Sequence, residues 1–221
     1  LVNNLHELGY VHGDVKPKNI LFINDKKKAM YLCDLDSAGK IGEASDTNKH
    51  STGYCAPELA RYCFISDENI QYKKMDTNYD IWSLGVLLYE LCTGQHLFAQ
   101  DIGDDVLINE TDKTILCAWH TIHDEYLNRI NFPSSPKFTE DAKNLVRMCL
   151  KGKPEERPKI QDILKHRFFN ASQSKKIEDN QPMKYHMFIS HSQAEASGEA
   201  GTLYNSLKQL GVHVWRDMTQ K

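Results

Sequence analysis

The chain has 221 residues, of which 27 are basic and 30 acidic, so its formal charge is −3. This balance gives no whole-chain attraction to nucleic acid or to an anionic membrane, and no nucleic-acid partner is expected. Hydrophobic residues make up 40% of the chain and charged residues 26%, which excludes wholesale disorder. The length allows one large or two small domains.

The cysteines and the apolar runs indicate a cytoplasmic protein. The six cysteines include no CxxC pair, which is typical of reduced thiols rather than of a disulfide framework. The longest apolar run, residues 81–92, is interrupted by polar residues and is too short to cross a bilayer, so no membrane segment is expected. The chain begins without a basic leader, so no signal peptide is expected.

The N-terminal part predicts short elements. The helical spacing of its apolar residues predicts a helix over residues 1–8, and a polar loop follows at 12–19. Apolar runs at 20–23 and 30–33, separated by a polar turn, predict an antiparallel β-hairpin. Residues 36–56 have no clear period and predict a loop.

The middle of the chain has a helical pattern. Residues 76–93 predict a helix with Asp76 or Thr77 as its N-cap and Gly94 as its stop. An acidic loop is expected at 99–113. Further helices are predicted at about 113–129, 139–150 and 159–167.

The C-terminal part has a different pattern. Residues 170–184 contain few apolar side chains and predict a linker. Strands at 185–190 and 212–215 flank a helix at 197–210, which is how a βαβ unit begins. The predicted fold is therefore mainly α with a small β-hairpin, followed by a truncated α/β, flavodoxin-like βαβ start.

Three polar residues are expected to converge at one end of the hairpin. Asn19 enters the first strand and Asp34 leaves the second, so antiparallel pairing puts them at the same end. Asp14 lies in the loop that leads into the first strand. Carboxylate and amide oxygens suit Mg²⁺, which completes its octahedron with water and phosphate oxygens.

Five ordered motifs resemble those of the eukaryotic protein kinases. The sequence HGDVKPKN at 12–19 resembles their catalytic loop, and DLD at 34–36 resembles their metal-binding DFG. APE at 56–58 matches the end of their activation segment. DIWSLG at 80–85 resembles the start of their buried central helix, and KPEERP at 153–158 resembles a turn that supplies an arginine.

The resemblance covers residues 1–169 and implies the C-terminal lobe of a kinase domain. The glycine-rich loop, the ATP-pairing lysine and its glutamate partner belong to the N-terminal lobe, which is missing from this sequence. The chain alone is therefore expected to bind ATP poorly and to be inactive. The expected domains are this lobe, the linker at 170–184 and a second unit at 185–221.

The resemblance also implies a role for each residue of the cluster. Asp14 would accept or orient the proton of a substrate hydroxyl, and Asn19 and Asp34 would hold Mg²⁺ on the phosphates of ATP. Lys16 would neutralise charge on the transferring phosphoryl group. A lysine two residues after the aspartate is similar to Ser/Thr kinases, so the expected partners are protein substrates with Ser or Thr.

Other matched positions belong to the activation segment or support the fold. Ser51 aligns with the hydroxyl residue that contacts the catalytic aspartate and lysine, and Thr52 is the alternative if the alignment shifts by one. The resemblance implies that Glu58 pairs with Arg157. Asp80 is expected to anchor the backbone of the catalytic loop.

Two positions depart from the kinase pattern. Gly13 stands where many kinases have an arginine that pairs with a phosphate on the activation loop. Removal of the hydroxyls of Ser45 and Thr47 is therefore expected to change activity little. Asp36 replaces the glycine of DFG; aspartate tolerates left-handed torsions better than most residues, but it adds charge near the metal.

The C-terminal part resembles the opening of a Toll/interleukin-receptor (TIR) domain. MFISH at 187–191, a helix with three spaced leucines and VHVWRD at 212–217 carry this resemblance. It implies TIR–TIR partners, but the sequence ends before the positions where TIR enzymes place their catalytic glutamate. Any flavodoxin-like βα start is the alternative.

Three functions follow from these resemblances. The first is a Ser/Thr kinase fused to a TIR-like module. The alternatives are a pseudokinase/TIR scaffold without phosphoryl transfer, and an NAD-consuming TIR enzyme with a regulatory kinase lobe. An ATP-pairing lysine upstream would favour the first, and a pocket glutamate downstream would favour the last.

Two further clusters have simpler interpretations. Cys117, His120 and His123 recur every three residues, which invites a zinc site, but without a fourth ligand a packed or solvated helix face is preferred. The acidic residues at 101–112 lack the order of an EF-hand and predict a solvated insertion, with docking of basic substrates as an alternative.

Overall fold

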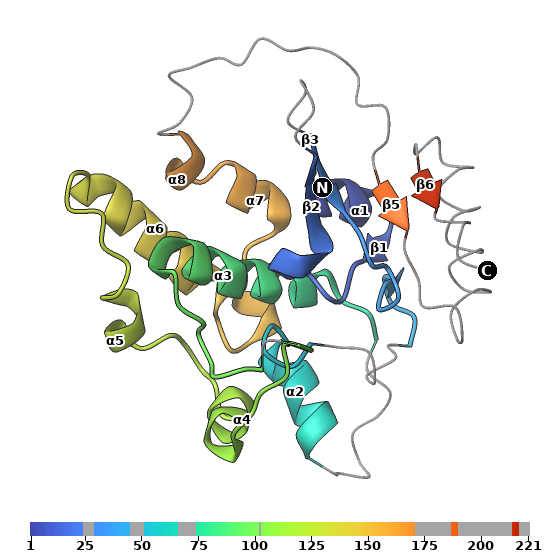
Figure 1. The fold of residues 1–221 in the computed structure, drawn as a ribbon, viewed down its shortest axis with the longest axis horizontal. Coiled ribbons are helices and arrows are strands. Elements are labelled where there is room, and N and C mark those ends of the chain that lie inside the picture. Colours follow the sequence, from blue (N-terminus) through green and yellow to red (C-terminus); the bar gives the residue numbers. More distant parts are fainter. Residues whose placement is uncertain are drawn as a thin grey trace.

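The computed structural model describes most of the chain up to Asn170 and two short strands beyond it. The described residues are 1–23, 29–44, 51–65, 74–101, 103–170, 187–189 and 214–216. Within them the chain is mostly helical, with three two-stranded sheets (Figure 1). None of the described helices is long and apolar enough to cross a membrane.

Helix α3, Thr77–Thr93, lies in the middle of the fold (Figure 1). It begins where the sequence predicts, because the Asp76 side chain accepts a hydrogen bond from the Asn78 N–H at 2.8 Å. It ends at Gly94, whose φ of 68° is the left-handed conformation that glycine adopts easily. Most of its residues are buried, so α3 forms the centre of the hydrophobic core.

The predicted β-hairpin is confirmed. Strand β2, Ile20–Ile23, pairs antiparallel with β3, Ala29–Leu32. A second antiparallel pair joins β1, Tyr10–Val11, to β4, Gly39–Lys40. Strand β4 lies within residues 36–56, for which the sequence predicts a loop. Strands of two residues are too short for an alternating pattern to appear in the sequence.

The other helices surround α3, and all except α6 have eight residues or fewer. They are α1 (Val2–Glu7), α2 (Pro57–Phe64), α4 (Glu110–Cys117), α5 (Asp124–Leu127), α6 (Pro136–Cys149), α7 (Ile160–Leu164) and α8 (Arg167–Asn170), with 3₁₀ turns at Pro17–Asn19 and Pro154–Glu156.

The prediction of one long helix at 113–129 is wrong, because α4 and α5 are separate. Asn109 caps α4 earlier than expected, accepting the N–H of the residue three positions on at 2.7 Å. Beyond α4 the carbonyl of His120 accepts the N–H of Gly152 at 2.7 Å. This contact joins distant segments, so local periodicity does not encode it. The helix predicted at 159–167 is likewise divided into α7 and α8.

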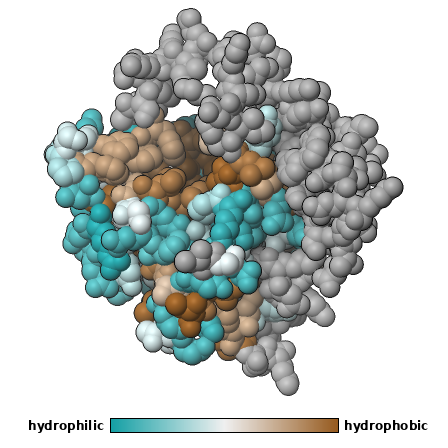
Figure 2. All heavy atoms as spheres, in the orientation of Figure 1, coloured by the Kyte–Doolittle hydropathy of each residue, from teal (hydrophilic) through white to brown (hydrophobic). Residues whose placement is uncertain are grey.

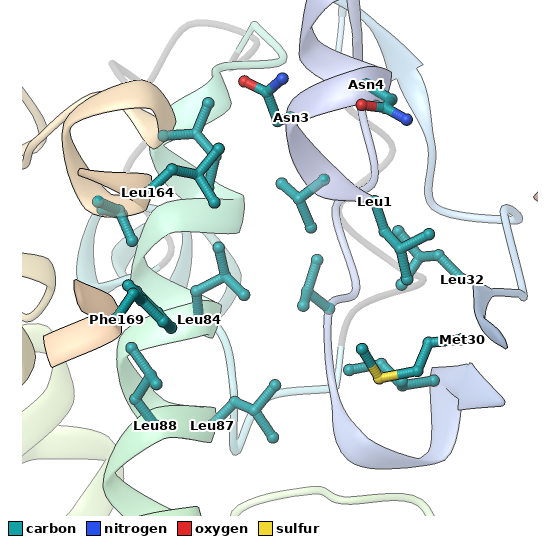
Figure 3. Close-up of a pocket in the computed structure, with 15 residues that line it drawn as sticks. Leu1, Asn3, Asn4, Met30, Leu32, Leu84, Leu87, Leu88, Leu164 and Phe169 are labelled. Atoms are coloured by element: carbon teal, nitrogen blue, oxygen red, sulfur yellow. The ribbon is translucent and has the colours of Figure 1, made fainter. Parts of the chain in front are cut away.

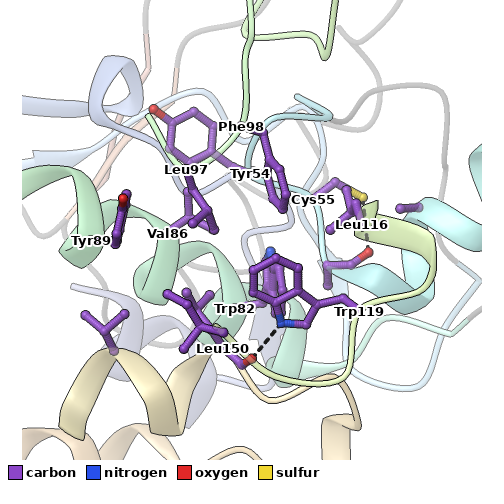
Figure 4. Packing of buried hydrophobic residues seen from close by; sticks show 14 of the residues in the cluster. Tyr54, Cys55, Trp82, Val86, Tyr89, Leu97, Phe98, Leu116, Trp119 and Leu150 are labelled. Atoms are coloured by element: carbon purple, nitrogen blue, oxygen red, sulfur yellow. Dashed lines mark hydrogen bonds between the residues drawn. The ribbon is translucent and has the colours of Figure 1, made fainter. Parts of the chain in front are cut away.

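Buried aromatic and aliphatic side chains hold these helices together. Trp82 and Trp119 meet edge to face at 5.5 Å inside the larger cluster (Figure 4). The indole N–H of Trp119 donates to the carbonyl of Leu150 at 2.9 Å. Helix α6 packs along α3, and Gly85 permits this approach because a Cβ there would lie 2.7 Å from the Cβ of Cys149.

An apolar pocket of about 340 Å³ lies between α1, the hairpin, α3 and α7 (Figure 3). Figure 2 shows apolar surface gathered on the same face of the molecule. Apart from Asn3 and Asn4 its lining is apolar, so it offers few groups for chemistry. The apolar lining includes Leu1, Val15, Leu32, Leu84, Leu88 and Ile163.

Two strands of the C-terminal part form a parallel pair. Strand β5, Met187–Ile189, pairs with β6, Val214–Arg216, in the two places where strands are predicted. Parallel strands require a crossover connection, as in a βαβ unit. The helix predicted at 197–210 lies outside the described residues, as does the linker at 170–184 except for Asn170.

Candidate active site

A buried carboxylate of α3 anchors the polar loop at 12–19. Asp80 is fully buried and accepts hydrogen bonds from the backbone N–H groups of His12 and Gly13, each at 2.9 Å. His6 Nε2 contacts the same carboxylate at 2.8 Å. The loop is therefore fixed to the central helix through its backbone, which is the arrangement expected for Asp80.

Asp14 and Asn19 lie together in this loop. The side-chain amide of Asn19 donates to the carbonyl of Asp14 at 2.8 Å and to its Oδ2 at 3.0 Å. Both residues are buried. The 3₁₀ turn Pro17–Asn19 directs the chain back toward Asp14, and the N–H of Cys33 donates to the carbonyl of Asn19 at 2.9 Å. Asn19 is thus held at the open end of the hairpin.

Asp34 follows Cys33 at the same end of the hairpin as Asn19. Its φ of 60° is a left-handed conformation that aspartate tolerates better than most residues. The amide nitrogen of Asn19 is directed at Asp14, which leaves the amide oxygen to act as a ligand. One carboxylate and one amide oxygen fit Mg²⁺, which takes its other ligands from phosphate and water.

The ammonium group of Lys16 has three acceptors around it. The Oγ of Ser51 lies at 2.5 Å, Oδ2 of Asp14 at 3.2 Å and Oδ2 of Asp105 at 3.3 Å. Burial acts to lower the pKa of Lys16, but the carboxylates of Asp14 and Asp105 outweigh it, and the pKa is raised. Lys16 is therefore charged at neutral pH.

The structure places Ser51, and not Thr52, beside the catalytic-loop residues. The backbone N–H of Ser51 also donates to Oδ1 of Asp14, at 3.2 Å. The hydroxyl of Thr52 instead accepts the backbone N–H of Leu107 at 2.8 Å. Of the two alignments left open by the sequence, the arrangement favours the one that uses Ser51.

Glu58 and Arg157 form a buried pair 99 residues apart in sequence. The two terminal nitrogens of Arg157 donate to the two carboxylate oxygens of Glu58, at 2.7 and 2.6 Å. The guanidinium also lies over the ring of Trp82, 5.2 Å from its centre. The pair ties the end of the activation segment to the turn after α6.

The two departures from the kinase pattern lie beside this cluster. Gly13 has a φ of 79°, and a Cβ there would lie 2.5 Å from the carbonyl oxygen of Ser37, so the backbone suits glycine. Asp36 lies in the turn that follows the hairpin. Ser45 and Thr47 lie outside the described residues.

Asp105 is a residue of this site that the sequence does not reveal. The acidic segment 101–112 predicts a solvated insertion, but Asp105 is only 5% exposed, so the prediction is wrong for this residue. Its carboxylate pairs with Lys16 at 3.3 Å and with Lys18 at 2.7 Å. Asp105 lies 87 residues beyond Lys18, and no local pattern signals a contact of such range.

The prediction that Cys117, His120 and His123 form one packed or solvated helix face is wrong, because the three residues do not lie on one helix. Helix α4 ends at Cys117, whose carbonyl accepts the Nε–H of Arg61 at 2.7 Å. His120 follows in a non-helical segment, and His123 is the N-cap residue of α5. Across the described ranges, no three His, Cys, Asp or Glu side chains gather as a metal site would require.

Comparisons with known proteins agree with the motifs at this site. Residues 2–169 match the family model of the protein kinase domain. The chain is 30% identical over 190 residues to a Dictyostelium discoideum protein named "Probable serine/threonine-protein kinase iksA", covering 77% of this chain and 19% of that protein. It is 29% identical over 214 residues to human serine/threonine-protein kinase Nek5, covering 94% of this chain and 26% of the kinase.

A third relative is the dual specificity mitogen-activated protein kinase kinase jkk-1 of Caenorhabditis elegans. It is 31% identical over 168 residues, covering 72% of this chain and 33% of the relative. The chain therefore spans a third or less of the length of each of these three relatives. The family match extends over most of the chain and includes every catalytic-loop residue described above, so the chain belongs to the protein kinase family.

Proposed function

We propose that this chain is the C-terminal lobe of a Ser/Thr protein kinase that transfers the γ-phosphoryl group of ATP to Ser or Thr hydroxyls of protein substrates. The observation that carries the proposal is the buried cluster in which Asp14 contacts Asn19, Lys16 and Ser51. The serine/threonine kinases among its relatives and the lysine two residues after Asp14 support this substrate class. The free cysteines in the described ranges are consistent with a cytoplasmic setting.

In this proposal, Asp14 acts on the substrate hydroxyl. As the hydroxyl oxygen bonds to phosphorus and the bond from phosphorus to the ADP oxygen breaks, the hydroxyl proton passes to the Asp14 carboxylate. The amide of Asn19 and the backbone N–H of Ser51 hold that carboxylate in one orientation. Lys16 directs its positive charge at the same volume, where it would stabilise the transferring group.

Asn19 and Asp34 are the residues that would hold Mg²⁺. Bound there, the ion would supply positive charge that offsets the negative charge of the transferring phosphoryl group. Two protein ligands leave most of the coordination sphere to phosphate and water, as is usual for Mg²⁺ at nucleotide sites. The backbone bond between Cys33 and Asn19 keeps the two ligands at one end of the hairpin.

The N-terminal lobe of the proposed kinase is not within this sequence. Only 11 residues precede His12, and they include no glycine-rich loop or ATP-pairing lysine. We therefore expect this chain alone to bind ATP weakly and to transfer phosphate only within a longer protein that supplies those parts.

The C-terminal part is proposed to begin a TIR-like, flavodoxin-like domain at residues 185–221. The parallel pairing of β5 with β6 supports an α/β unit there. Such a module could recruit TIR partners, which keeps a scaffold without phosphoryl transfer as the second candidate. An NAD-consuming role has no assignable catalytic residue in this chain.

The substitution Asp14→Asn tests the proposed function in the longer protein. It keeps the shape of the side chain but removes the proton acceptor, so phosphorylation of a Ser/Thr peptide should slow by about 10²–10⁴-fold. Asp162→Asn is the matched control, because Asp162 is an exposed carboxylate on α7. An unchanged rate in Asp14→Asn would overturn the role given to Asp14, whereas no transfer even by the unaltered protein would favour the scaffold.

A further inference from the structure

A loop at 103–108 is docked on the activation segment and on the catalytic loop. The carbonyl of Asp105 accepts the N–H of Gly53 at 2.9 Å, and the N–H of Leu107 donates to the hydroxyl of Thr52 at 2.8 Å. The ammonium of Lys18 donates to the carbonyl of Gly103 at 3.0 Å. The loop is therefore joined to the activation segment at Thr52 and Gly53 and to the catalytic loop at Lys18.

The side chain of Asp105 is turned inward from this loop. It is 7% exposed, although the neighbouring Asp104 and Val106 are exposed. Its φ of 56° is a left-handed conformation, which is uncommon outside glycine, asparagine and aspartate. This backbone conformation accompanies a carboxylate that lies between Lys16 and Lys18.

The ammonium group of Lys16 cannot contact Asp105 and a phosphoryl group at the same time. A lysine ammonium has three N–H donors, and three acceptors, on Ser51, Asp14 and Asp105, already lie within 3.3 Å of it. The first two belong to the proposed catalytic machinery. Asp105 is the third, so its carboxylate takes the place that an anionic phosphoryl oxygen would need.

The ion pair between Asp105 and Lys16 does not satisfy every buried polar atom of the contact. Oδ2 of Asp105 is buried and, within the described part of the chain, accepts no hydrogen bond; Lys16 lies 3.3 Å from this oxygen, while Lys18 pairs with the other carboxylate oxygen at 2.7 Å. A second carboxylate beside Asp14 also repels an incoming phosphate. The contact between Asp105 and Lys16 therefore excludes a phosphoryl group and also leaves a buried carboxylate oxygen without a hydrogen bond.

We propose that Asp105 is an internal competitor for the phosphoryl position on Lys16, so that the 103–108 loop holds the site in an inhibited state and must withdraw before transfer. This inference rests on the proposed kinase function. It assigns a regulatory role to a loop whose composition alone indicates a solvated insertion.

The first test measures the contact itself in the chain described here. Asp105→Asn removes the charge and keeps a side chain that tolerates the left-handed backbone, and Asp104→Asn removes one charge from the exposed neighbour. Both proteins are treated with the N-hydroxysuccinimide ester of acetate, and acetylation of Lys16 is quantified by mass spectrometry. Labelling of Lys16 should rise severalfold in Asp105→Asn alone; equal labelling in both variants overturns the proposal.

The second test measures phosphoryl transfer in the longer protein with the same two variants. Because Asp105→Asn raises the fraction of molecules in which Lys16 is free, it should increase the rate severalfold, while Asp104→Asn should match the unaltered protein. An unchanged or lower rate in Asp105→Asn overturns the inhibitory role. Failure of the kinase function is distinguishable, because the unaltered protein and both variants would then all be inactive while the difference in Lys16 labelling persisted.

Discussion

Arg157 shows how a single side chain can join three distant parts of the chain. Besides Glu58, it donates to the backbone carbonyls of Lys151 at 2.8 Å, Asn78 at 2.9 Å and Gly152 at 3.3 Å. Its side chain is completely buried, so its charge depends on these acceptors. A buried charge that is fully paired is stable in place, but it becomes costly as soon as its partner is removed.

Glu58→Leu should therefore destabilise the fold strongly. The substitution leaves Arg157 buried without its carboxylate, which typically costs about 3–5 kcal/mol. The control is Glu156→Gln, which breaks an exposed pair with Lys153 and should cost less than about 1 kcal/mol. Urea unfolding of both variants measures the difference, and a loss below about 1 kcal/mol for Glu58→Leu would contradict the structural role.

The sequence predicts the positions of some residues of the site but not of others. Asp14, Asn19 and Asp34 can be placed together because the antiparallel register and the chain order fix them at one end of a hairpin. Asp105 cannot be placed, because its position depends on the path of a loop after α3 and on contacts with the activation segment. An acidic run in sequence looks the same whether one of its members is buried or not.

Among the elements, the packing of α3 against α6 depends on the absence of a side chain at Gly85. The helix pattern at 76–93 is strong enough to predict its start at the Asp76 cap and its end at Gly94. The division at 113–129 is not predictable, because it follows from a backbone contact between His120 and Gly152 rather than from local preference.

Gly85→Ala should separate the two helices. The added Cβ would lie 2.7 Å from Cys149 and 2.8 Å from Leu150, so it overpacks the interface and should cost about 1–3 kcal/mol despite the better helix propensity of alanine. Leu91→Ala is the control on the same helix, since Leu91 is 74% exposed and its truncation should cost less than about 0.5 kcal/mol. Thermal unfolding measures the stability of both variants. Equal melting temperatures for Gly85→Ala and Leu91→Ala would show that α6 moves aside without cost.

For the whole molecule, the division of the chain into two units remains a prediction. The family match ends at residue 169, where the sequence becomes poor in apolar side chains. Among the residues described beyond that point, the parallel pair β5–β6 agrees with the predicted strands. The composition therefore predicts where the two units separate.

Limited proteolysis should reveal this division. Because residues 170–184 are predicted to be a linker and residues 185–221 are too few to form an independent core, cleavage should begin in the linker. The fragment 185–221 should then be degraded faster than 1–169. Mass spectrometry of the digest checks the order, and a resistant fragment covering 185–221 would instead identify a self-sufficient domain.

The edge-to-face pair of Trp82 and Trp119 gives the molecule an optical property. The chain has three tryptophans, and these two lie in the core around α3 while the third, Trp215, belongs to β6. Two of the three tryptophans therefore sense the polarity of the lobe interior. Tryptophan emission from a Trp215→Phe protein, excited selectively over tyrosine, would come from that interior alone, and a red shift on unfolding would report the loss of the core without any attached dye.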